Sequence, residues 1–326
     1  MKKMEKMGEI IRVITLLLVT LLVSGMIPSG AEANNVFQIG IIQVVEHPAL
    51  DAAREGFMAA IEAEGLSAEF DYLNAQGDIP TLATIAQRFT HNNVDLVLAI
   101  ATPSVQAMSA ETYSIPIVGT AITSYVRAGV AYSNEAPGFN ITGASDMNPI
   151  EAQIRMIFEF VPDMQTLGIA YSSNEANSVY QAEIARAVAE SLGLTVIEAT
   201  VTTTGDVQQN TTALAGQVDA IWIPTDNTYA NAMPIVGQVS IDTGVPVFPS
   251  EEGMVMGGGV ATLSVNYFEL GYQSGRMAAQ ILRGEGEPAT MPIQFAQNFN
   301  YIVNGFMAGE LGLDVPEQYR AYIRQP

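Results

Sequence analysis

Residues 94–120 read VDLVLAIATPSVQAMSAETYSIPIVGT, and this stretch decides the fold class. The nearly continuous apolar run from Val94 to Ala101 predicts a buried strand, Pro103 to Thr112 predicts a short helix, and Ile115 to Thr120 predicts a second strand. Continuous apolar strands separated by helices are typical of a parallel sheet covered on both faces. The stretch therefore predicts an α/β fold.

The same alternation continues on both sides of this stretch and restarts after residue 140. A chain of 326 residues with two such series exceeds what one compact core accommodates, so the pattern predicts two Rossmann-like lobes with parallel sheets. No Pro- or Ser-rich linker separates the series, which indicates direct crossovers between lobes. The expected strands span 37–45, 68–73, 94–101, 115–120, 141–144, 166–171, 195–201, 218–223, 245–248 and 260–265; the expected helices span 48–64, 79–91, 103–112, 149–160, 178–192, 206–215 and about 227–242.

The first 33 residues have the order of a secretory signal peptide. A basic stretch ending at Arg12 precedes an apolar run over 13–23, and Ala31-Glu32-Ala33 supplies the small residues of a cleavage site. The apolar run is shorter than the roughly 18 residues that a membrane-spanning helix needs. We therefore expect cleavage after Ala33 and a periplasmic or secreted protein, which cannot be anchored through a lipidated cysteine because the chain has none.

Composition disfavours several classes of function. The formal net charge is −21 and all three lysines lie in the first six residues, so the mature chain is not expected to bind nucleic acid or anionic membranes. The chain has no cysteine, which disfavours thiolate catalysis, and no lysine after cleavage, which disfavours pyridoxal chemistry. Two histidines are too few for a histidine metal cluster. We expect no cofactor, no metal and no enzymatic activity, although a carboxylate-based hydrolase remains open.

Eight segments in order over essentially the whole mature chain resemble the tryptophan/tyrosine-type substrate-binding proteins of ABC transporters. They are EHPALDAAREGF (46–57), AQGD (75–78), LAIATP (98–103), ITGASDMNPI (141–150), SSNEANS (172–178), VDAIWIPTDN (218–227), FPSEEG (248–253) and YFELGYQSGRMAAQIL (267–282). The resemblance implies a type I periplasmic binding fold, a monomer, an aromatic amino acid as ligand, and a cognate ABC permease and ATPase as partners. Ser124-Tyr125 stands where Asp-Pro is expected, and SSNEANS is a rearranged NSSEANS, so the preferred side chain stays open.

The resemblance also implies three crossings between the lobes, which we place near Ser145-Asp146, near Asn266 and near residues 290–296. The first lobe is then 34–145 plus 266–292, and the second is 146–265 plus 293–326. The helix over 267–282 is expected to return to the first lobe, where Gly271 and Gly275 permit a close approach of helices.

Ligands of open parallel sheets lie beyond the carboxyl ends of the strands, where this sequence places polar loops. We expect Thr102 and Ser104, at the start of a helix, to hold a ligand carboxylate, and Asp226, or else Glu46, to accept hydrogen bonds from a ligand ammonium. The candidate ligand-binding residues in these loops are Glu46, Thr102, Pro103, Ser104, Thr123, Ser145, Ser173, Asn174, Asn177, Asp226, Asn227 and Glu251.

Simpler roles remain open for several of these residues. Thr102 and Asp226 could each cap the helix that follows, and Asn177 or Ser178 could cap the helix expected over 178–192. His47 is expected to orient the loop before Pro48. We expect His91 on the surface and Trp222 in the core; the residues that could form an aromatic wall, unranked, are Tyr125, Phe139, Tyr171, Tyr229 and Tyr267.

Three other functions are compatible with the sequence. They are a type I sugar-binding protein, a ligand-sensing partner of a membrane receptor, and an exported carboxylate hydrolase. The first is disfavoured because sugar sites usually stack on several aromatic rings, whereas the one tryptophan lies in an expected strand.

Overall fold

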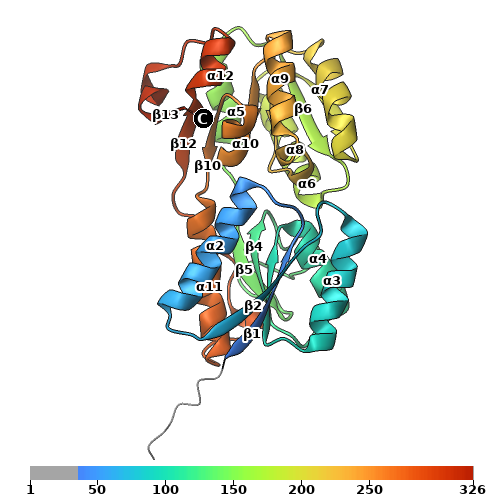
Figure 1. Cartoon of the computed structure of the whole chain (residues 1–326). Coiled ribbons are helices and arrows are strands. Elements are labelled where there is room, and N and C mark those ends of the chain that lie inside the picture. The colour runs from blue at the N-terminus through green and yellow to red at the C-terminus, as the bar shows by residue number, and fades with distance from the viewer. Residues whose placement is uncertain (1–35, 326) are drawn as a thin grey trace, which may run out of the picture. The chain divides into compact units, whose positions relative to one another are not determined.

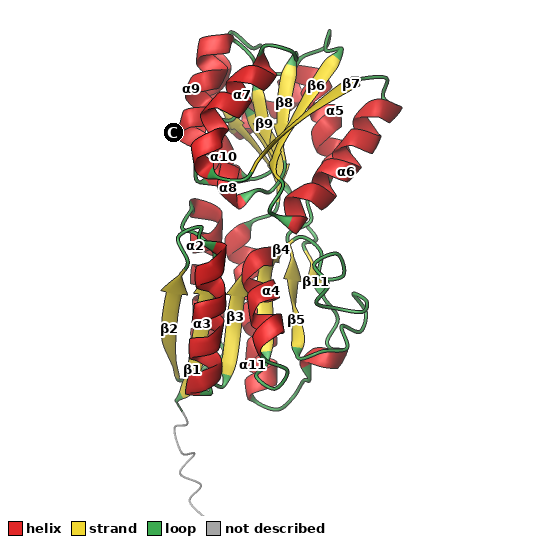
Figure 2. Ribbon diagram, turned by 90° about the vertical axis from the view of Figure 1, so that its right-hand side faces the viewer, coloured by secondary structure: helices red, strands yellow, loops and turns green. Residues whose placement is uncertain are grey.

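The computed structural model describes residues 36–325, which contain two parallel sheets in two lobes (Figures 1 and 2). The expected signal peptide, residues 1–33, lies outside the described residues. The α/β fold class with two lobes of parallel sheet is confirmed.

The sheet of the first lobe has the strand order β11-β5-β4-β3-β1-β2, and its paired strands run parallel. Its central strands are apolar on both faces, and β3 and β4 are buried at every position. The strands are β1 (Phe37–Gln43), β2 (Ala68–Asn74), β3 (Leu96–Ile100), β4 (Ile117–Ile122), β5 (Ile141–Ser145) and β11 (Gln294–Phe295).

Four helices cover this sheet (Figure 1), together with the 3-10 turn η2 (Pro288–Thr290). α2 packs against α11, and α3 packs against α4 on the opposite face. The helices α2 and α11 approach closely because glycines face each other's backbone: a Cβ on Gly271 would lie 1.8 Å from the carbonyl oxygen of Ala53. The helices are α2 (Pro48–Ala63), α3 (Ile79–Asn92), α4 (Thr102–Glu111) and α11 (Tyr267–Leu282).

The second lobe repeats the arrangement with the strand order β7-β6-β8-β9. One apolar core on each face covers this sheet, and Trp222 is fully buried in one of them, as expected. The strands are β6 (Thr166–Ser172), β7 (Thr195–Val201), β8 (Ala220–Ile223) and β9 (Val247–Pro249). The helices are α5 (Ile150–Phe160), α6 (Ala176–Ser191), α7 (Val207–Ala215), α8 (Asn227–Ala230), α9 (Met233–Thr243) and α10 (Glu252–Gly258), with the 3-10 turn η1 (Thr204–Asp206).

A third, small sheet with the order β10-β12-β13 completes the second lobe. The strand expected over 260–265 belongs here, pairing antiparallel with β12 and not with the parallel sheet. The elements are β10 (Ala261–Ser264), β12 (Asn300–Asn304) and β13 (Ile323–Arg324), with α12 (Gly305–Glu310) and the 3-10 turn η3 (Glu317–Tyr322).

Two expected boundaries differ from the structure. The helix expected over about 227–242 is two helices, because the chain turns after Ala230 and Pro234 lies in the first turn of α9, where proline is tolerated. The first lobe was expected to end at residue 292, but β11 pairs with Ala144 and Ser145 of β5. Gln294 and Phe295 therefore add a strand to the edge of the first sheet, and a third crossing after Phe295 stays within the expected range of 290–296.

Candidate functional site

Each parallel sheet has one position where neighbouring strands lead to helices on opposite faces. In the first lobe it lies between β1, which leads to α2, and β3, which leads to α4. In the second lobe it lies between β6, which leads to α6, and β8, which leads to α8 and α9. A crevice forms beyond the strand ends at such a position, and ligands of open α/β sheets bind there.

The two crevices face one another. The Nε2 atom of His47, after β1, lies 3.3 Å from Oδ1 of Asn227, after β8. The Nε2 atom of Gln181 on α6 donates a hydrogen bond of 3.3 Å to Oγ1 of Thr123, after β4. A cavity of about 200 Å³ lies between the loops, with Val44 and Pro103 on one side and Asn227 on the other.

In the first lobe, the loop after β3 presents hydroxyl groups without protein partners. Thr102 and Ser104 are buried, and neither Oγ atom has a hydrogen-bond partner. Thr102 was considered as a helix cap, but α4 begins at Thr102 and its N-cap residue is Ala101, so this alternative is wrong. The two hydroxyls are therefore free to donate hydrogen bonds to another molecule.

The backbone at this edge is strained. Ala101, after β3, has a φ of 76°, and Ala121, near the end of β4, has a φ of 57°. Residues with a Cβ rarely adopt such angles, which cost about 1–3 kcal/mol and concentrate at functional sites. The conformation of Ala101 turns the chain from β3 into α4, whose first residue is Thr102.

In the second lobe, Asp226 lies at the centre of the facing edge. It is 1 % exposed, and its carboxylate accepts hydrogen bonds from the backbone N–H of Ser172 and from that of Tyr229. The second contact confirms that Asp226 caps α8. Burial, followed by the neighbouring Glu175 carboxylate, raises the pKa of Asp226 well above its ordinary value. A cation at this position would stabilise the ionised form.

Glu175 holds the adjacent loop in place. Its carboxylate accepts hydrogen bonds from the backbone N–H groups of Asn227 and Thr228 and from both side chains. Asn177 donates from Nδ2 to the carbonyl oxygen of Thr225, so its Oδ1 is an acceptor, and this buried atom has no partner. The N-cap residue of α6 is Glu175 and no side chain caps it, so the capping role considered for Asn177 or Ser178 is wrong.

Buried side-chain polar atoms without a partner gather at these two edges. Within residues 36–325, only the hydroxyls of Thr90 and Thr211 lie elsewhere. Such atoms are rare in folded proteins because an unmade buried hydrogen bond costs about 1–3 kcal/mol. Their concentration at the two facing edges makes these edges the candidate ligand site; the atoms are Nδ1 of His47, the hydroxyl oxygens of Thr102, Ser104, Thr120 and Ser172, and Oδ1 of Asn177.

Residues of the crossovers form a second polar cluster. Asp146 follows β5 and accepts hydrogen bonds from Oγ1 of Thr123 and from the hydroxyl of Tyr267, while Ser145 donates to the carbonyl oxygen of Thr123. Burial raises the pKa of Asp146 to about 6. The Asp146–Tyr267 bond links the first crossover to the start of α11, directly after the second.

Four candidate residues have protein partners of their own. Glu46 is exposed and accepts from the hydroxyl of Tyr72, and Ser173 and Asn174 are exposed and donate to carbonyl oxygens of residues 201 and 202. Asn174 still lines the cavity between the lobes. Glu251 is buried, but its carboxylate caps α10, and it lines a different pocket, between α2, α10 and α11. Burial raises the pKa of Glu251 to about 7.

The aromatic residues that could have formed a wall lie mostly elsewhere. Tyr125 and Tyr229 are fully buried in the lobe cores, and Phe139 packs against Tyr132 with the two rings tilted. None of the five lines the cavity of about 200 Å³. Its apolar wall is instead aliphatic and comes from the first lobe, with Val44, Val45, Ile79 and Pro103.

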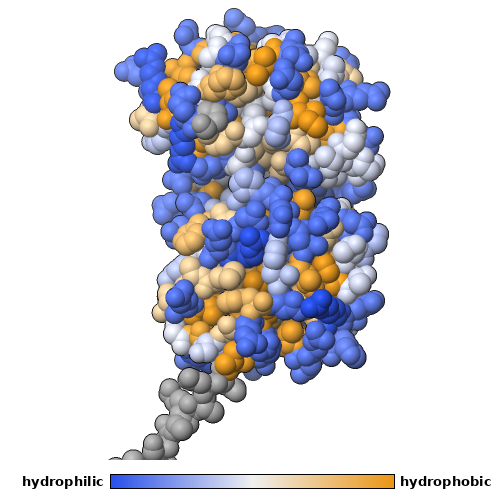
Figure 3. Space-filling model, viewed as in Figure 1, coloured by the Kyte–Doolittle hydropathy of each residue, from blue (hydrophilic) through white to orange (hydrophobic). Residues whose placement is uncertain are grey.

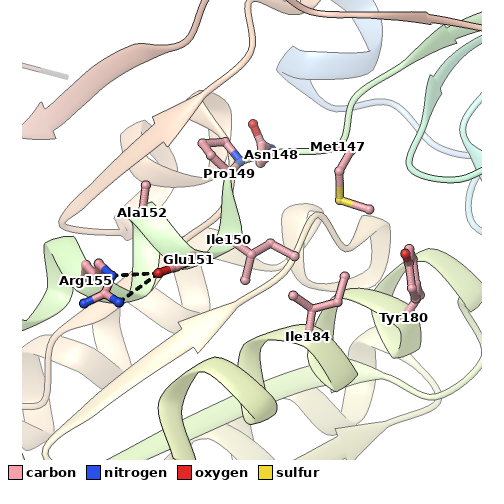
Figure 4. A pocket seen from close by; sticks show the side chains of 9 residues that line it. All are labelled: Met147, Asn148, Pro149, Ile150, Glu151, Ala152, Arg155, Tyr180 and Ile184. Carbon is pink, nitrogen blue, oxygen red and sulfur yellow. Dashed lines mark hydrogen bonds and ion pairs between the residues drawn. The ribbon is translucent and has the colours of Figure 1, made fainter. Parts of the chain in front are cut away.

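A larger hollow of about 640 Å³ lies on the second lobe between α5 and α6 (Figure 4). Its charged residues, Glu151 and Arg155, are exposed and form an ion pair with an N···O distance of 2.8 Å. It belongs to one lobe, and none of the buried polar atoms without a partner lies in its lining, so it is not the candidate ligand site. Its Tyr180 lies under the guanidinium of Arg127 from the first lobe.

Sequence reasoning gave His47 only the role of orienting its loop, and it did not single out Ser172 or Gln181 as members of the cleft. Gln181 lies one turn inside a helix, and Ser172 ends a strand, so neither follows a strand as a loop residue does. Among residues 36–325 no group of histidine and acidic side chains is arranged to hold a metal ion. None of the helices in this range combines the length and the hydrophobicity of a membrane span.

Two lobes that face each other across polar strand ends define the type I periplasmic binding fold, a class of solute-binding proteins. Residues 38–325 match the family of ABC transporter substrate-binding proteins, and the chain belongs to that family. Members of this family bind small molecules outside the cytoplasm for ABC transporters. The family is defined by binding rather than catalysis.

Characterised relatives are similar over most of the chain. A tyrosine-binding protein of Clostridioides difficile is 36 % identical over 270 residues, covering 82 % of this chain and 78 % of the relative. A Streptococcus pneumoniae ABC domain solved with L-Trp is 35 % identical with a TM-score of 0.86. A ligand-free, open substrate-binding protein with adhesive properties from Clostridium difficile is 38 % identical with a TM-score of 0.69. Each of these two structures covers 89 % of this chain and is itself 99 % covered.

Proposed function

We propose that this protein is the extracytoplasmic binding component of an ABC importer and captures an α-amino acid, with aromatic amino acids as the preferred class. The observation that carries the proposal is the polarity of the cleft. The first lobe offers the hydroxyl donors of Thr102 and Ser104, and the second offers the acceptors Asp226 and Asn177. An amino-acid zwitterion has the complementary pair of groups.

The carboxylate of the ligand would lie at the N-terminus of α4. No lysine follows residue 6 and no arginine lines the cavity, so neutral donors would hold this carboxylate. Hydroxyls and the N-terminal end of a ten-residue helix supply such donors, and the helix dipole favours negative charge there. Burial opposes the ionisation of Asp226, and the positive charge of the ammonium would offset this effect.

The aliphatic wall of the cavity supports an apolar ligand side chain. Val44, Val45, Ile79 and Pro103 form this wall, whereas the second lobe contributes mainly polar residues. The tyrosine-binding relative and the L-Trp complex, both at least 35 % identical, agree with an aromatic side chain.

Binding would act through closure of the lobes. The described chain superposes better on the L-Trp complex than on the open relative, at comparable identity and coverage, which supports a closed arrangement. The contacts of His47 with Asn227 and of Thr123 with Gln181 would then belong to the closed state. A ligand that touches both lobes binds this state better and shifts the population toward it.

The remaining parts of the proposal concern the whole chain. We propose cleavage after Ala33, lobes of 34–145 plus 266–295 and 146–265 plus 296–326, no catalysis, and a monomer that docks on a permease and ATPase. On the face shown in Figure 3, hydrophilic residues interrupt the apolar areas, which agrees with a monomer.

A thermal-shift screen of the mature chain tests this function, with the twenty amino acids and common sugars as ligands. A ligand at a hundred times its Kd stabilises by about 2.7 kcal/mol, and we expect a shift of roughly 5 °C or more with L-tryptophan, L-tyrosine or L-phenylalanine. Stabilisation by a sugar alone would overturn the assignment to amino acids.

A further inference from the structure

His47 occupies an unusual position between the lobes. It precedes α2 and is 7 % exposed, yet its side chain does not cap that helix. Its Nε2 atom instead faces Oδ1 of Asn227 in the other lobe, and its Nδ1 atom is buried without a partner.

The hydrogen bonds of Asn227 fix which nitrogen of His47 carries the proton. Nδ2 of Asn227 donates to the Glu175 carboxylate, so the amide is oriented with Oδ1, an acceptor, toward His47. Nε2 of His47 must then be the donor, which leaves Nδ1 with a lone pair. The chain of contacts from Glu175 through Asn227 to His47 thus prepares a buried acceptor beside the cleft.

We propose that Nδ1 of His47 accepts a hydrogen bond from the ligand ammonium, so that His47 selects ligands with a protonated amino group. This inference rests on the proposed function. An ammonium has three N–H donors, and the cleft offers three matching acceptors: Nδ1 of His47, Oδ1 of Asn177 and the Asp226 carboxylate. Each of the three residues has a contact at this edge of the second lobe. His47 contacts Asn227, Asp226 accepts from Ser172, and Asn177 donates to Glu175.

Protonation of His47 would remove this acceptor and place a cation beside the ammonium. Burial lowers the pKa of His47 from its ordinary value of 6.5. Three groups act in the opposite direction and raise it: the Asn227 side chain, the Asp51 carboxylate on α2 and the Glu175 carboxylate of the second lobe. Glu46, next in the chain, is exposed and bonded to Tyr72, and Glu251 near α2 caps its own helix. His47 is therefore neutral at pH 7.5, and affinity should fall at acidic pH, where His47 takes up a proton.

Two substitutions separate the two nitrogens of His47. His47→Gln can keep a donor toward Asn227 but removes the acceptor at the Nδ1 position, whereas His47→Asn can keep an acceptor near Nδ1 but loses the contact with Asn227. The matched control is His91→Gln, because His91 is the only other histidine of the chain and is exposed on α3. Titration calorimetry of the mature chain uses L-tryptophan, L-tyrosine and indole-3-propionate, which lacks the amino group.

We expect His47→Gln to weaken binding of the two amino acids about tenfold or more, with His47→Asn less affected and His91→Gln unchanged. Indole-3-propionate should not distinguish His47→Gln from wild type. The loss of affinity at acidic pH should be smaller in His47→Gln. Equal binding of amino acids by wild type and His47→Gln would overturn the role of His47 while leaving the proposed function intact.

Nitrogen-15 NMR gives an independent readout in the ligand-free protein. With two histidines in the chain, the His91→Gln variant assigns the His47 signals directly. We expect His47 as the Nε2–H tautomer, with the Nδ1 signal moving when L-tryptophan is added. The Nδ1–H tautomer would refute the inference even if amino acids bind. Failure of wild type to bind any amino acid would instead refute the proposed function.

Discussion

The carboxylate of Asp226 accepts a hydrogen bond of 2.6 Å from the backbone N–H of Ser172, which joins the ends of β8 and β6. This contact fixes the carboxylate at the point where the second sheet diverges. Both residues are almost fully buried, and the Oγ atom of Ser172 has no partner. The finding places an acidic group, held by the backbone, where the fold favours a ligand.

Replacing Asp226 with asparagine tests its role toward the ammonium. Asp226→Asn keeps the shape and one acceptor but removes the charge, so we expect amino-acid affinity to fall at least about thirtyfold, because loss of one partner of a buried charge pair costs about 2–5 kcal/mol. The matched control is Asp219→Asn, since Asp219 also accepts from backbone N–H groups in this lobe, those of residues 165 and 166 at the start of β6. It should bind normally; calorimetry showing equal losses in both variants would exclude Asp226 as a ligand contact.

Thr102→Val tests the carboxylate site. The hydroxyl of Thr102 has no protein partner, so its removal should leave stability unchanged or raise it, while ligand affinity falls about tenfold. Thr90→Val is the control, because Thr90 also carries a hydroxyl without a partner but lies on α3, away from the cleft. We expect Thr90→Val to bind normally, measured by calorimetry and urea unfolding. A variant Thr102→Val that loses stability but not affinity would contradict the assignment.

Asp146 should make the stability of the ligand-free protein depend on pH. Burial raises its pKa from 3.8 to about 6, so its favourable contribution is complete below pH 3.8 and is lost as the pH rises through 6. Asp146→Asn should therefore gain stability relative to wild type between pH 4 and pH 7.5, by about 3 kcal/mol at most, since one pKa unit corresponds to about 1.4 kcal/mol. Tyr267→Phe removes a donor to this carboxylate and should shift the transition to higher pH. Parallel stability curves for wild type and Asp146→Asn in urea unfolding would refute this prediction.

Arg127 should strengthen closure modestly. Its guanidinium pairs with Glu183 of the other lobe at 2.7 Å and lies 4.8 Å from the ring centroid of Tyr180. Both charged side chains are about half exposed, so Arg127→Gln should speed ligand dissociation only about two- to fivefold, and less in high salt. Arg155→Gln, which breaks a pair within α5, should leave dissociation unchanged. Stopped-flow dissociation rates that are equal for both variants would exclude a role in closure.

The sequence predicted the elements whose physical signal is local. Apolar runs located the central strands, and the glycines of α11 predicted its close packing on α2, where Gly271 faces Ala53. The helix α10 was missed because its sequence EGMVMGG has no amphipathic period. Pro234 indicates a helix start near residue 233, but the apolar residues around it led to the prediction of one continuous helix over about 227–242.

The site was predicted only in part, because it depends on pairings between distant residues. The loop after β3 directed attention to Thr102 and Ser104, but whether Thr102 caps its helix depends on the backbone angle of Ala101. The position of His47 follows from contact with Asn227, 180 residues away, which no local pattern encodes.

Titration of the mature chain, residues 34–326, with L-tryptophan and L-tyrosine tests the binding role most directly. We predict saturation at one ligand per chain, with the ligand recovered unchanged by chromatography after the titration. An absence of heat with every amino acid, together with consumption of another compound, would contradict a two-lobed amino-acid clamp.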